Sequence, residues 1–476
     1  MAERQHKLQA IMISVPFQGH INPFVNLALK LASKGCAITF VHLQHIHQKL
    51  SKAHNSDDLF SEARGSGLDI RYTTISDGLP LEFDRDLHAE EYWVHLFREF
   101  PAIVDDFVGT AIEADPYLVP FLVADTVYAW PAAVAEKYKL VNVSLWTEPA
   151  LVFSLVYHEH LLKERGHIPC KDDQVQEINY VPGVESISTN DLMSYLSETD
   201  DILLETLSAA FKGVKKADFI LHNIVHELES KTLSALNKYQ LNYAIGPINF
   251  YKNLAANTIS KSLVSESECA PWLASKPPGS VLYVSFGSIA QTSKHVIEEI
   301  AYGLLLSEVK FIWVVRAGIV SFDDDTNVLP EGFEDMIKDK GLIIPWCNQI
   351  TVLSDPAVGG FLTHCGWNST IESMWCGVPM ICYPITYDQP TNRKLVVDNW
   401  KIGISLCDGK SVNRKEVAEN IKSCMSGTCS KSLRQEAKKV KDILQNALEV
   451  DGSSDRNFDQ FFNDLKAKIN DTATSE

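Results

Sequence analysis

The sequence is short of basic residues compared with acidic ones. Its 43 lysine and arginine residues stand against 61 aspartate and glutamate residues, which gives a formal charge of -18. A surface for nucleic acid or anionic lipid needs clustered basic side chains, so neither partner is expected. An anion must instead be bound locally, by a helix N-terminus and a few placed side chains.

Long apolar runs are also missing. The longest ones, such as Ser280–Phe286 and Phe311–Val315, have the length of a β-strand, whereas a membrane-spanning helix needs about 20 apolar residues. The N-terminal stretch MAERQHKLQA is polar and lacks the apolar core of a secretory signal. We therefore expect a cytoplasmic protein without stable membrane insertion.

The 10 cysteines lack the paired spacing of a disulfide framework or a zinc site, which predicts reduced thiols. His42, His45 and His47 lie close together but have no carboxylate or cysteine near them in the sequence, so we expect a surface or rim position. Asp323 and Asp325 form an Asp-x-Asp pair whose polar neighbours favour a solvated loop. No metal site is predicted.

The length of 476 residues exceeds what one hydrophobic core usually organises, and strand-like and helix-like segments alternate through both halves. This alternation predicts an α/β protein with two doubly wound, Rossmann-like domains of parallel sheet, whose strand ends face a shared cleft. The alternation weakens around residues 246–267. We place the first domain at residues 1–247, a linker at 248–268, the second domain at 269–455 and a terminal helical segment at 456–476.

Two local patterns in the first domain give specific helix predictions. Asn22-Pro23 has the form of a helix cap followed by a first-turn proline, which predicts a helix that begins there and continues through Phe24–Leu31. Residues Glu91–Ala114 are predicted to form a single helix, because their apolar positions keep a helical spacing.

An anion site is predicted where an apolar strand runs into His364 and a turn at Gly366 is followed by Asn368 and Ser369. Such a helix start presents unpaired N–H groups and the positive end of the helix dipole to a phosphate. His364 could donate to the same anion, and Glu372, one turn later, could accept from ribose hydroxyls. On these residues alone, a capped helix after a buried strand is an equally good interpretation.

Two neighbouring strand ends carry further polar or aromatic groups. Trp346 follows one predicted strand and could stack on a base, with Gln349 three residues later. Asp388 and Gln389 follow another predicted strand and carry acceptor and amide groups suited to sugar hydroxyls. A stacking group, an anion site and a polyol-binding pair at three strand ends are the parts that a nucleotide sugar needs.

The segment from Trp346 to Gln389, WCNQITVLSDPAVGGFLTHCGWNSTIESMWCGVPMICYPITYDQ, closely resembles the signature box of plant UDP-dependent glycosyltransferases of small molecules. Other segments resemble further motifs of that family, at Pro16–Pro23, Ala217–Asn223, Ser280–Ser288 and Asp451–Ser454. The resemblance covers nearly the whole chain and implies the GT-B fold. It places the acceptor in the first domain, the UDP-sugar in the second, and the final helix back on the first domain.

The resemblance also implies roles for individual residues. Trp346 would stack on uracil, Gln349 and Glu372 would hold the ribose, and Asp388 and Gln389 would bind the sugar hydroxyls. The full set of implied donor contacts is Thr147, Ser288, Trp346, Cys347, Gln349, His364, Trp367, Asn368, Ser369, Glu372, Asp388 and Gln389. Gln as the last residue of the box is associated with glucose, so UDP-glucose is the expected co-substrate. No metal or other cofactor is implied.

A catalytic pair is predicted on the opposite wall. His20 lies in the loop after the first predicted strand, and Asp125 ends a later strand of the same sheet, so both face the cleft. A histidine oriented by a carboxylate is a general base, which glycosyl transfer to a hydroxyl needs. Two plainer interpretations stay open: His20 as a helix-start residue satisfied by backbone groups, and Asp125 as a helix N-cap. The residues expected to contact the acceptor are Phe17, Gly19, Trp146 and Tyr387.

The sequence thus predicts a monomeric enzyme that transfers glucose, with inversion, from UDP-glucose to a hydroxyl of a lipophilic, phenolic or terpenoid-like small molecule. Loops at Asp77–Arg85, Phe153–His158 and Tyr180–Tyr195 are expected to line the acceptor site. Asn348 and Asp355 depart from the usual form of the box. Asp355 lies outside the implied donor contacts, so we expect activity to survive that departure. The open alternatives are another UDP-sugar, an epimerase or phosphorylase with this fold, and a non-catalytic UDP-sugar sensor.

Overall fold

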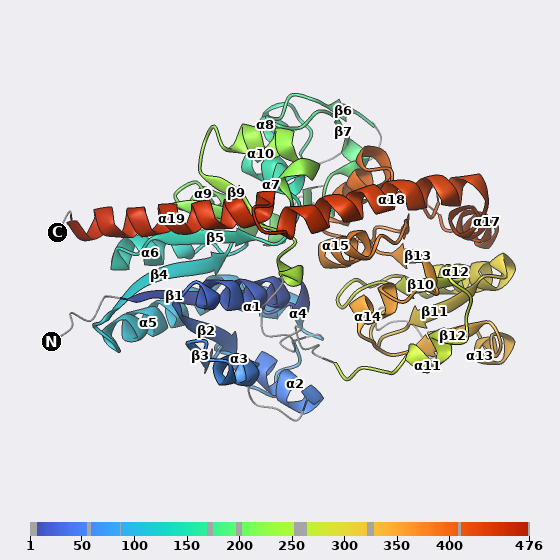
Figure 1. Ribbon diagram of the computed structural model, residues 1–476, viewed down its shortest axis with the longest axis horizontal. Helices are drawn as coiled ribbons and strands as arrows, with labels where there is room; N and C mark the ends of the chain where they lie inside the picture. Colours follow the sequence, from blue (N-terminus) through green and yellow to red (C-terminus); the bar gives the residue numbers. More distant parts are fainter. Residues whose placement is uncertain are drawn as a thin grey trace.

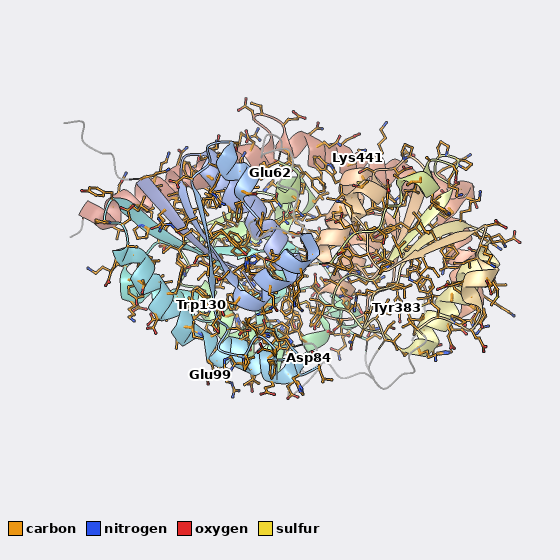
Figure 2. The ribbon with its side chains drawn as sticks, turned by 90° about the horizontal axis from the view of Figure 1, so that it is seen from below. Glu62, Asp84, Glu99, Trp130, Tyr383 and Lys441 are labelled. Atoms are coloured by element: carbon orange, nitrogen blue, oxygen red, sulfur yellow. The ribbon has the colours of Figure 1, made fainter. Side chains whose placement is uncertain are left out.

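The computed structural model describes residues 7–54, 59–85, 87–168, 175–196, 202–251, 264–320, 328–407 and 411–474. Two parallel sheets form the centres of two halves, and a pair of long helices near the C-terminus runs across both (Figure 1). In the view from below, Glu62 and Trp130 belong to the half with the first sheet, and Tyr383 and Lys441 to the half with the second (Figure 2).

The first sheet has seven parallel strands in the order β3-β2-β1-β4-β5-β8-β9. Their bounds are β1 (Lys7–Ile13), β2 (Ala37–Leu43), β3 (Ile70–Ile75), β4 (Leu118–Asp125), β5 (Asn142–Trp146), β8 (Phe219–His222) and β9 (Asn242–Ala244). Every residue of β2 is buried, as expected for a strand covered by helices on both faces. The strand order reverses between β1 and β4, so a crevice opens at their carboxyl ends. His20 and Asp125 lie at this crevice, just beyond the paired residues Ile13 and Ala124.

The second sheet has six parallel strands in the order β12-β11-β10-β13-β14-β15. Their bounds are β10 (Val281–Ser285), β11 (Lys310–Val314), β12 (Gly341–Ile344), β13 (Val358–Thr363), β14 (Met380–Cys382) and β15 (Gly403–Ser405). The order reverses between β10 and β13, where Ser285 pairs with Thr363. The loops that carry Ser288 and His364 follow directly, so they occupy the second crevice.

Helices cover both sheets. Those of the first half are α1 (Gln18–Ser33), α2 (Gln44–His54), α3 (Ser61–Gly65), α4 (Ala89–Arg98), α5 (Phe100–Glu113), α6 (Pro131–Tyr138), α7 (Ala150–Tyr157), α8 (Glu159–Glu164), α9 (Ile202–Val214) and α10 (Ser230–Leu236). Those of the second half and the C-terminus are α11 (Ala270–Leu273), α12 (Lys294–Ser307), α13 (Phe333–Met336), α14 (Gln349–Leu353), α15 (Trp367–Cys376), α16 (Gln389–Lys394), α17 (Arg414–Met425), α18 (Gly427–Leu448) and α19 (Ser453–Thr474). Within the described ranges, no helix is both long enough and apolar enough to cross a membrane.

Short elements complete the chain. They are the hairpin of β6 (Glu177–Ile178) and β7 (Ile187–Ser188), and the single turns η1 (Thr189–Asp191), η2 (Ser194–Leu196), η3 (His226–Leu228), η4 (Ile248–Phe250) and η5 (Leu395–Asn399).

Both helix predictions for the first domain are wrong in a specific way. Helix α1 begins at Gln18 rather than at Asn22, and Pro23 lies inside it. The segment predicted as one helix from residue 91 to 114 is two helices, α4 and α5, and Pro101 stands in the first turn of α5. Proline is tolerated in a first turn because its missing N–H would have no intrahelical partner there, and this favours a new helix start.

The last helix, α19, contacts the first half. The rings of Phe461 and Tyr243 have their centroids 5.7 Å apart, and the Tyr243 hydroxyl donates to Asp464 Oδ2 over 2.6 Å. Lys30 of α1 forms an ion pair with Asp455 at 3.4 Å. Helix α19 therefore contacts both β9 and α1, and α1 is the helix that starts beside the cleft.

Direct contacts also join the two halves beside the cleft. Trp367 Nε1 donates to the carbonyl of Asn223 over 3.1 Å, and the N–H of Ser194 donates to the carbonyl of Tyr387 over 2.9 Å. Further contacts between the halves are Thr391 with Asp191, Arg393 with Asp191, and Trp400 with Leu228. The two crevices are thus held facing each other.

Candidate active site

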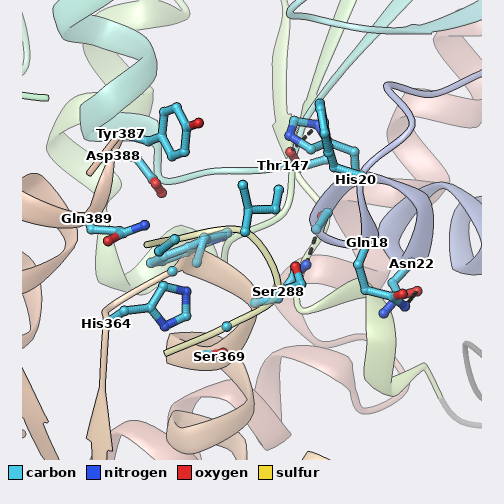
Figure 3. A pocket seen from close by; sticks show the side chains of 18 of the residues that line it. Gln18, His20, Asn22, Thr147, Ser288, His364, Ser369, Tyr387, Asp388 and Gln389 are labelled. Carbon is cyan, nitrogen blue, oxygen red and sulfur yellow. Dashed lines mark hydrogen bonds between the residues drawn. The ribbon is translucent and has the colours of Figure 1, made fainter. Parts of the chain in front are cut away.

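A cavity of about 290 Å³ lies between the carboxyl ends of the two sheets, with side chains from both halves on its walls (Figure 3). It gathers every residue that the sequence predicted for the site except Asp125, which lies behind His20. The predicted residues that line it are Phe17, Gly19, His20, Trp146, Thr147, Ser288, Trp346, Cys347, Gln349, His364, Trp367, Asn368, Ser369, Glu372, Tyr387, Asp388 and Gln389.

His20 and Asp125 form a hydrogen-bonded pair. His20 Nδ1 lies 2.8 Å from Asp125 Oδ2, and the Asp125 side chain is almost fully buried. The same carboxylate accepts from the N–H groups of Val15 and Val127, which fixes its orientation. Because the carboxylate accepts, Nδ1 carries the proton, and Nε2 is left as the basic nitrogen.

The contacts of this pair determine the protonation of His20. They also rule out the two plainer interpretations, His20 satisfied by backbone groups and Asp125 as a helix N-cap. Burial opposes a charge on His20, but the charge and hydrogen bond of Asp125, together with the charge of Asp388, outweigh it and raise the pKa of His20. The imidazole is thus paired with side chains rather than satisfied by backbone groups. Asp125 is not a helix N-cap, because the next helix begins at Pro131. Thr147 Oγ1 lies 3.2 Å from His20 Nδ1, which places the threonine beside the pair.

The predicted anion site has His364 at its centre, between β13 and α15. Glycines make room for the imidazole: a Cβ at Gly287 would lie 2.3 Å from His364 Nε2, and one at Gly366 would lie 2.4 Å from it. Burial, aided by the charge of Arg316, lowers the pKa of His364 to about 4. His364 is therefore neutral near pH 7, so it can help a phosphate through a hydrogen bond but not through a charge.

Gln349 and Glu372, the predicted ribose-binding pair, contact each other. Gln349 Nε2 donates to Glu372 Oε2 over 2.6 Å and to Ser369 Oγ over 2.9 Å. The Tyr283 hydroxyl donates to Gln349 Oε1 over 3.3 Å, so the amide is fixed on both sides. Burial raises the pKa of Glu372 to about 7, and the bond from Gln349 opposes this shift.

Asp388 and Gln389 present opposite hydrogen-bonding groups to the cavity. Gln389 Oε1 accepts from the N–H groups of Ile385 and Thr386, at 2.8 and 3.0 Å, which leaves its amide N–H groups for a ligand. Asp388 Oδ2 accepts from Asn392 Nδ2 over 2.5 Å, and burial raises the pKa of Asp388 to about 6. Such a pair can hold two hydroxyls, one as donor and one as acceptor.

Sequence reasoning missed part of the cavity wall. Among the missed residues are Trp93, Val127, Glu148, Leu203 and Leu207. Trp93 and the leucines come from α4 and α9, where their helical spacing looks like ordinary core packing. Glu148 directly follows Thr147, and that adjacency was the only available signal.

Of the three loops predicted to line the acceptor site, one contributes a residue to the cavity. Tyr195 lines the cavity, but no described residue of 77–85 or 153–158 does. Phe153 is fully buried in the core, where its ring lies 5.5 Å from that of Trp146. The aromatic residues of this segment serve packing, because α7 is buried on all sides.

The histidine tract was placed wrongly. His42 and His45 are buried rather than at the surface, and His45 Nδ1 lies 3.0 Å from Asp77 Oδ2, a carboxylate distant in sequence. The Asp323–Asp325 segment lies outside the described residues. Among the residues that the structure does describe, no group of three His, Cys, Asp or Glu side chains could hold a metal ion.

Two parallel α/β domains that share one cleft define a GT-B glycosyltransferase, with a histidine–aspartate pair on one wall and a helix N-terminus on the other. Comparison with known proteins agrees. The family model described as "UDP-glucoronosyl and UDP-glucosyl transferase" matches residues 224–434. UDP-glycosyltransferase 86A1 of Arabidopsis thaliana is 48% identical over 98% of this chain and 96% of its own length. The chain belongs to the plant UDP-glycosyltransferase family.

Other relatives support the same assignment. 7-Deoxyloganetin glucosyltransferase of Catharanthus roseus is 34% identical, with 97% of each chain covered. Os79 of O. sativa, solved in complex with UDP, has a TM-score of 0.80 at 25% identity, over 96% of this chain and all of its own. The predicted GT-B fold and the predicted enzyme class are confirmed, and the enzyme uses a UDP-sugar as co-substrate.

Proposed function

We propose that this enzyme transfers glucose from UDP-glucose to a hydroxyl of a lipophilic small molecule, with inversion at the anomeric carbon. One observation carries the proposal: His20, oriented by Asp125, lies across the cavity from Asp388 and Gln389 (Figure 3). A base on one wall and hydroxyl-binding groups on the other leave the sugar between them.

In the proposed step, His20 Nε2 takes the proton of the acceptor hydroxyl while the hydroxyl oxygen attacks the anomeric carbon. The bond from that carbon to the β-phosphate oxygen breaks, and UDP leaves with the electron pair. Because attack comes from the face opposite the leaving group, the α-linked glucose of the donor becomes β-linked in the product. Asp125 stabilises the imidazolium that forms.

The charge of the leaving UDP is met by the N-terminus of α15, whose first residues include Asn368 and Ser369. Neutral His364 adds a hydrogen bond to the same phosphate. These groups take the place of a metal cation, so we expect activity to survive EDTA. Loss of activity in EDTA, with recovery on adding Mg²⁺ or Mn²⁺, would contradict this part of the proposal.

Glucose is favoured as the transferred sugar. The Asp388 carboxylate and the Gln389 amide fit hydroxyls that both accept and donate. The relative from Catharanthus roseus is itself named a glucosyltransferase. Another UDP-sugar is the alternative, and a donor panel with one fixed acceptor decides it by the highest kcat/KM.

A lipophilic acceptor is favoured by the cavity wall that the first half of the chain supplies. This wall is formed by the aromatic and aliphatic residues Trp93, Val127, Tyr195, Leu203 and Leu207. Removing apolar surface from water stabilises a bound molecule by roughly 25 cal/mol per Å², so this wall selects an apolar acceptor.

The test is an acceptor screen with the full chain and UDP-glucose, using phenolic and terpenoid alcohols and scoring mass gain together with UDP release. We expect both signals, and only when an acceptor is present. A sensor would give neither signal, and an epimerase would convert UDP-glucose without an acceptor. An α-linked product in the proton NMR spectrum would contradict inversion.

A further inference from the structure

Two short loops, one from each half of the chain, meet beside the cavity and are joined by reciprocal hydrogen bonds. The N–H of Tyr387 donates to Ser194 Oγ over 2.7 Å, and the N–H of Ser194 donates to the carbonyl of Tyr387 over 2.9 Å. Ser194 Oγ also lies 3.2 Å from Thr386 Oγ1. Ser194 begins η2 in the first half, whereas Thr386 and Tyr387 follow β14 in the second half. One serine thus contacts two successive residues of the opposite loop.

Tyr387 has a backbone conformation that needs such support. Its φ is 58°, in the left-handed region where a Cβ is crowded. Lys139 and Glu308 have similar angles, but each ends a helix, where this conformation is common. Tyr387 instead lies two residues before α16 begins at Gln389. A residue in this region persists only where its surroundings hold it, and the two hydrogen bonds to Ser194 can do so.

Tyr387 directly precedes the two residues to which we assign sugar binding. Tyr387, Asp388 and Gln389 lie together at one side of the cavity (Figure 3). Gln389 Oε1 accepts from the N–H of Thr386 over 3.0 Å, so the orientation of the Gln389 amide depends on the backbone that Ser194 contacts. The direction of the Asp388 side chain depends on the same backbone, because the dihedral angles of Tyr387 set the path of the chain into Asp388.

We propose that Ser194 is a positioning residue for the transferred sugar: from the first half of the chain, it holds Tyr387 in the left-handed conformation and thereby directs Asp388 and Gln389 toward the sugar. Ser194 is not among the residues that line the cavity, so it acts through Tyr387. Its neighbour Tyr195 does line the cavity, on the wall to which we assign the acceptor. This inference rests on the proposed function, since it concerns the same sugar site.

The experiment measures the Kd of UDP-glucose and the Kd of UDP by calorimetry, without an acceptor, in the wild type, Ser194→Ala and Ser194→Thr. Alanine removes the acceptor of the Tyr387 N–H, whereas threonine keeps the hydroxyl. We expect Ser194→Ala to raise the Kd of UDP-glucose about tenfold and to leave the Kd of UDP within about twofold of wild type, because UDP has no sugar. Ser194→Thr should stay within about threefold of wild type for both ligands.

Asp191→Asn controls for a general loosening of the two halves. Asp191 lies on the same segment as Ser194 and joins the halves through its ion pair with Arg393, further along α16. Its loss should leave the ratio of the two Kd values unchanged. An unchanged ratio in Ser194→Ala, or an equal shift of the ratio in Asp191→Asn or in Ser194→Thr, would overturn the inference. If the wild type transfers glucose to no acceptor, the proposed function fails, but the Kd ratio still decides the role of Ser194.

Discussion

Asn368 Nδ2 donates a hydrogen bond to the carbonyl of Gly19, and the two atoms lie 2.8 Å apart. The contact joins α15, the helix to which we assign UDP binding, to α1, the helix that carries His20. Pro23 makes it possible. An α-helical carbonyl normally accepts from the N–H four residues later, and at that position Pro23 has none, so the Gly19 carbonyl is open to Asn368. A proline inside the helix thus helps to hold α1, with His20, against the N-terminus of α15.

Replacing Pro23 by alanine is predicted to lower kcat about threefold to tenfold. This factor corresponds to the exchange of one hydrogen bond, which contributes about 1 kcal/mol. Alanine restores the N–H that competes with Asn368 for the Gly19 carbonyl. Thermal unfolding should show no loss of stability, because alanine favours the helix. Pro101→Ala is the matched control: Pro101 stands in a first turn, where it frees no such carbonyl. Equal kcat values in the two variants would count against the link.

Asp125→Asn is predicted to lower kcat by about a hundredfold, because the amide neither orients Nδ1–H nor stabilises the imidazolium. The pH profile should move as well. Activity needs neutral His20 and rises as pH rises through its pKa. Burial opposes protonation, but Asp125, with the charge of Asp388, more than offsets it and raises that pKa. Removing the charge should therefore shift the acid limb of kcat/KM to lower pH. If kcat falls but the acid limb of kcat/KM stays at the same pH, a group other than His20 titrates in that limb.

Gly287→Ala is predicted to weaken UDP binding at least tenfold. Gly287 has a φ of 72°, and a Cβ there would lie 2.3 Å from His364 Nε2, so the imidazole must move. Gly332 provides a control for backbone strain alone: its φ is 71°, and a Cβ would meet nothing within 4 Å. Gly332→Ala should cost about 1 kcal/mol of stability and leave UDP affinity unchanged, as calorimetry can measure. If Gly287→Ala and Gly332→Ala bound UDP with equal affinity, His364 would have no part in phosphate binding.

Gln389→Glu is predicted to raise the KM for UDP-glucose at least tenfold without changing the affinity for UDP. A carboxylate can still accept from Ile385 and Thr386, so the loop stays anchored, but the donor that faces the sugar is lost. The new charge also lies next to Asp388. The exposed Gln435→Glu controls for the added charge. A matching loss of UDP affinity would show that the loop, and not the sugar contact, had been damaged.

Much of the fold followed from local pattern. The predicted pair of Rossmann-like domains is observed as two parallel sheets, because buried apolar strands and the helices between them leave patterns that span only a few residues. The start of α1 was misjudged because the Gly19 carbonyl, which Pro23 leaves without its usual donor, accepts from Asn368, which lies 349 residues after Gly19 and in the other half. No pattern in the residues near Pro23 identifies Asn368 as that partner.

The donor side of the site was predictable because its groups follow strand ends in the order of the signature box. The acceptor side was not. Trp93 and Leu207 have the spacing of core residues, and only the packing of α4 and α9 shows that they line the cavity. Among the described residues, the buried Oε2 atom of Glu148 has no hydrogen-bond partner, and this is likewise a property of three-dimensional packing that the sequence does not display.

The most direct test of the account is UDP release by His20→Ala with UDP-glucose and an acceptor that the wild type uses. The matched control is His226→Ala, at an exposed histidine outside the cavity. The account predicts at least a hundredfold loss of release in His20→Ala, with UDP affinity retained, because a general base typically contributes about 10² to 10⁴ in rate. Undiminished release from His20→Ala would contradict it.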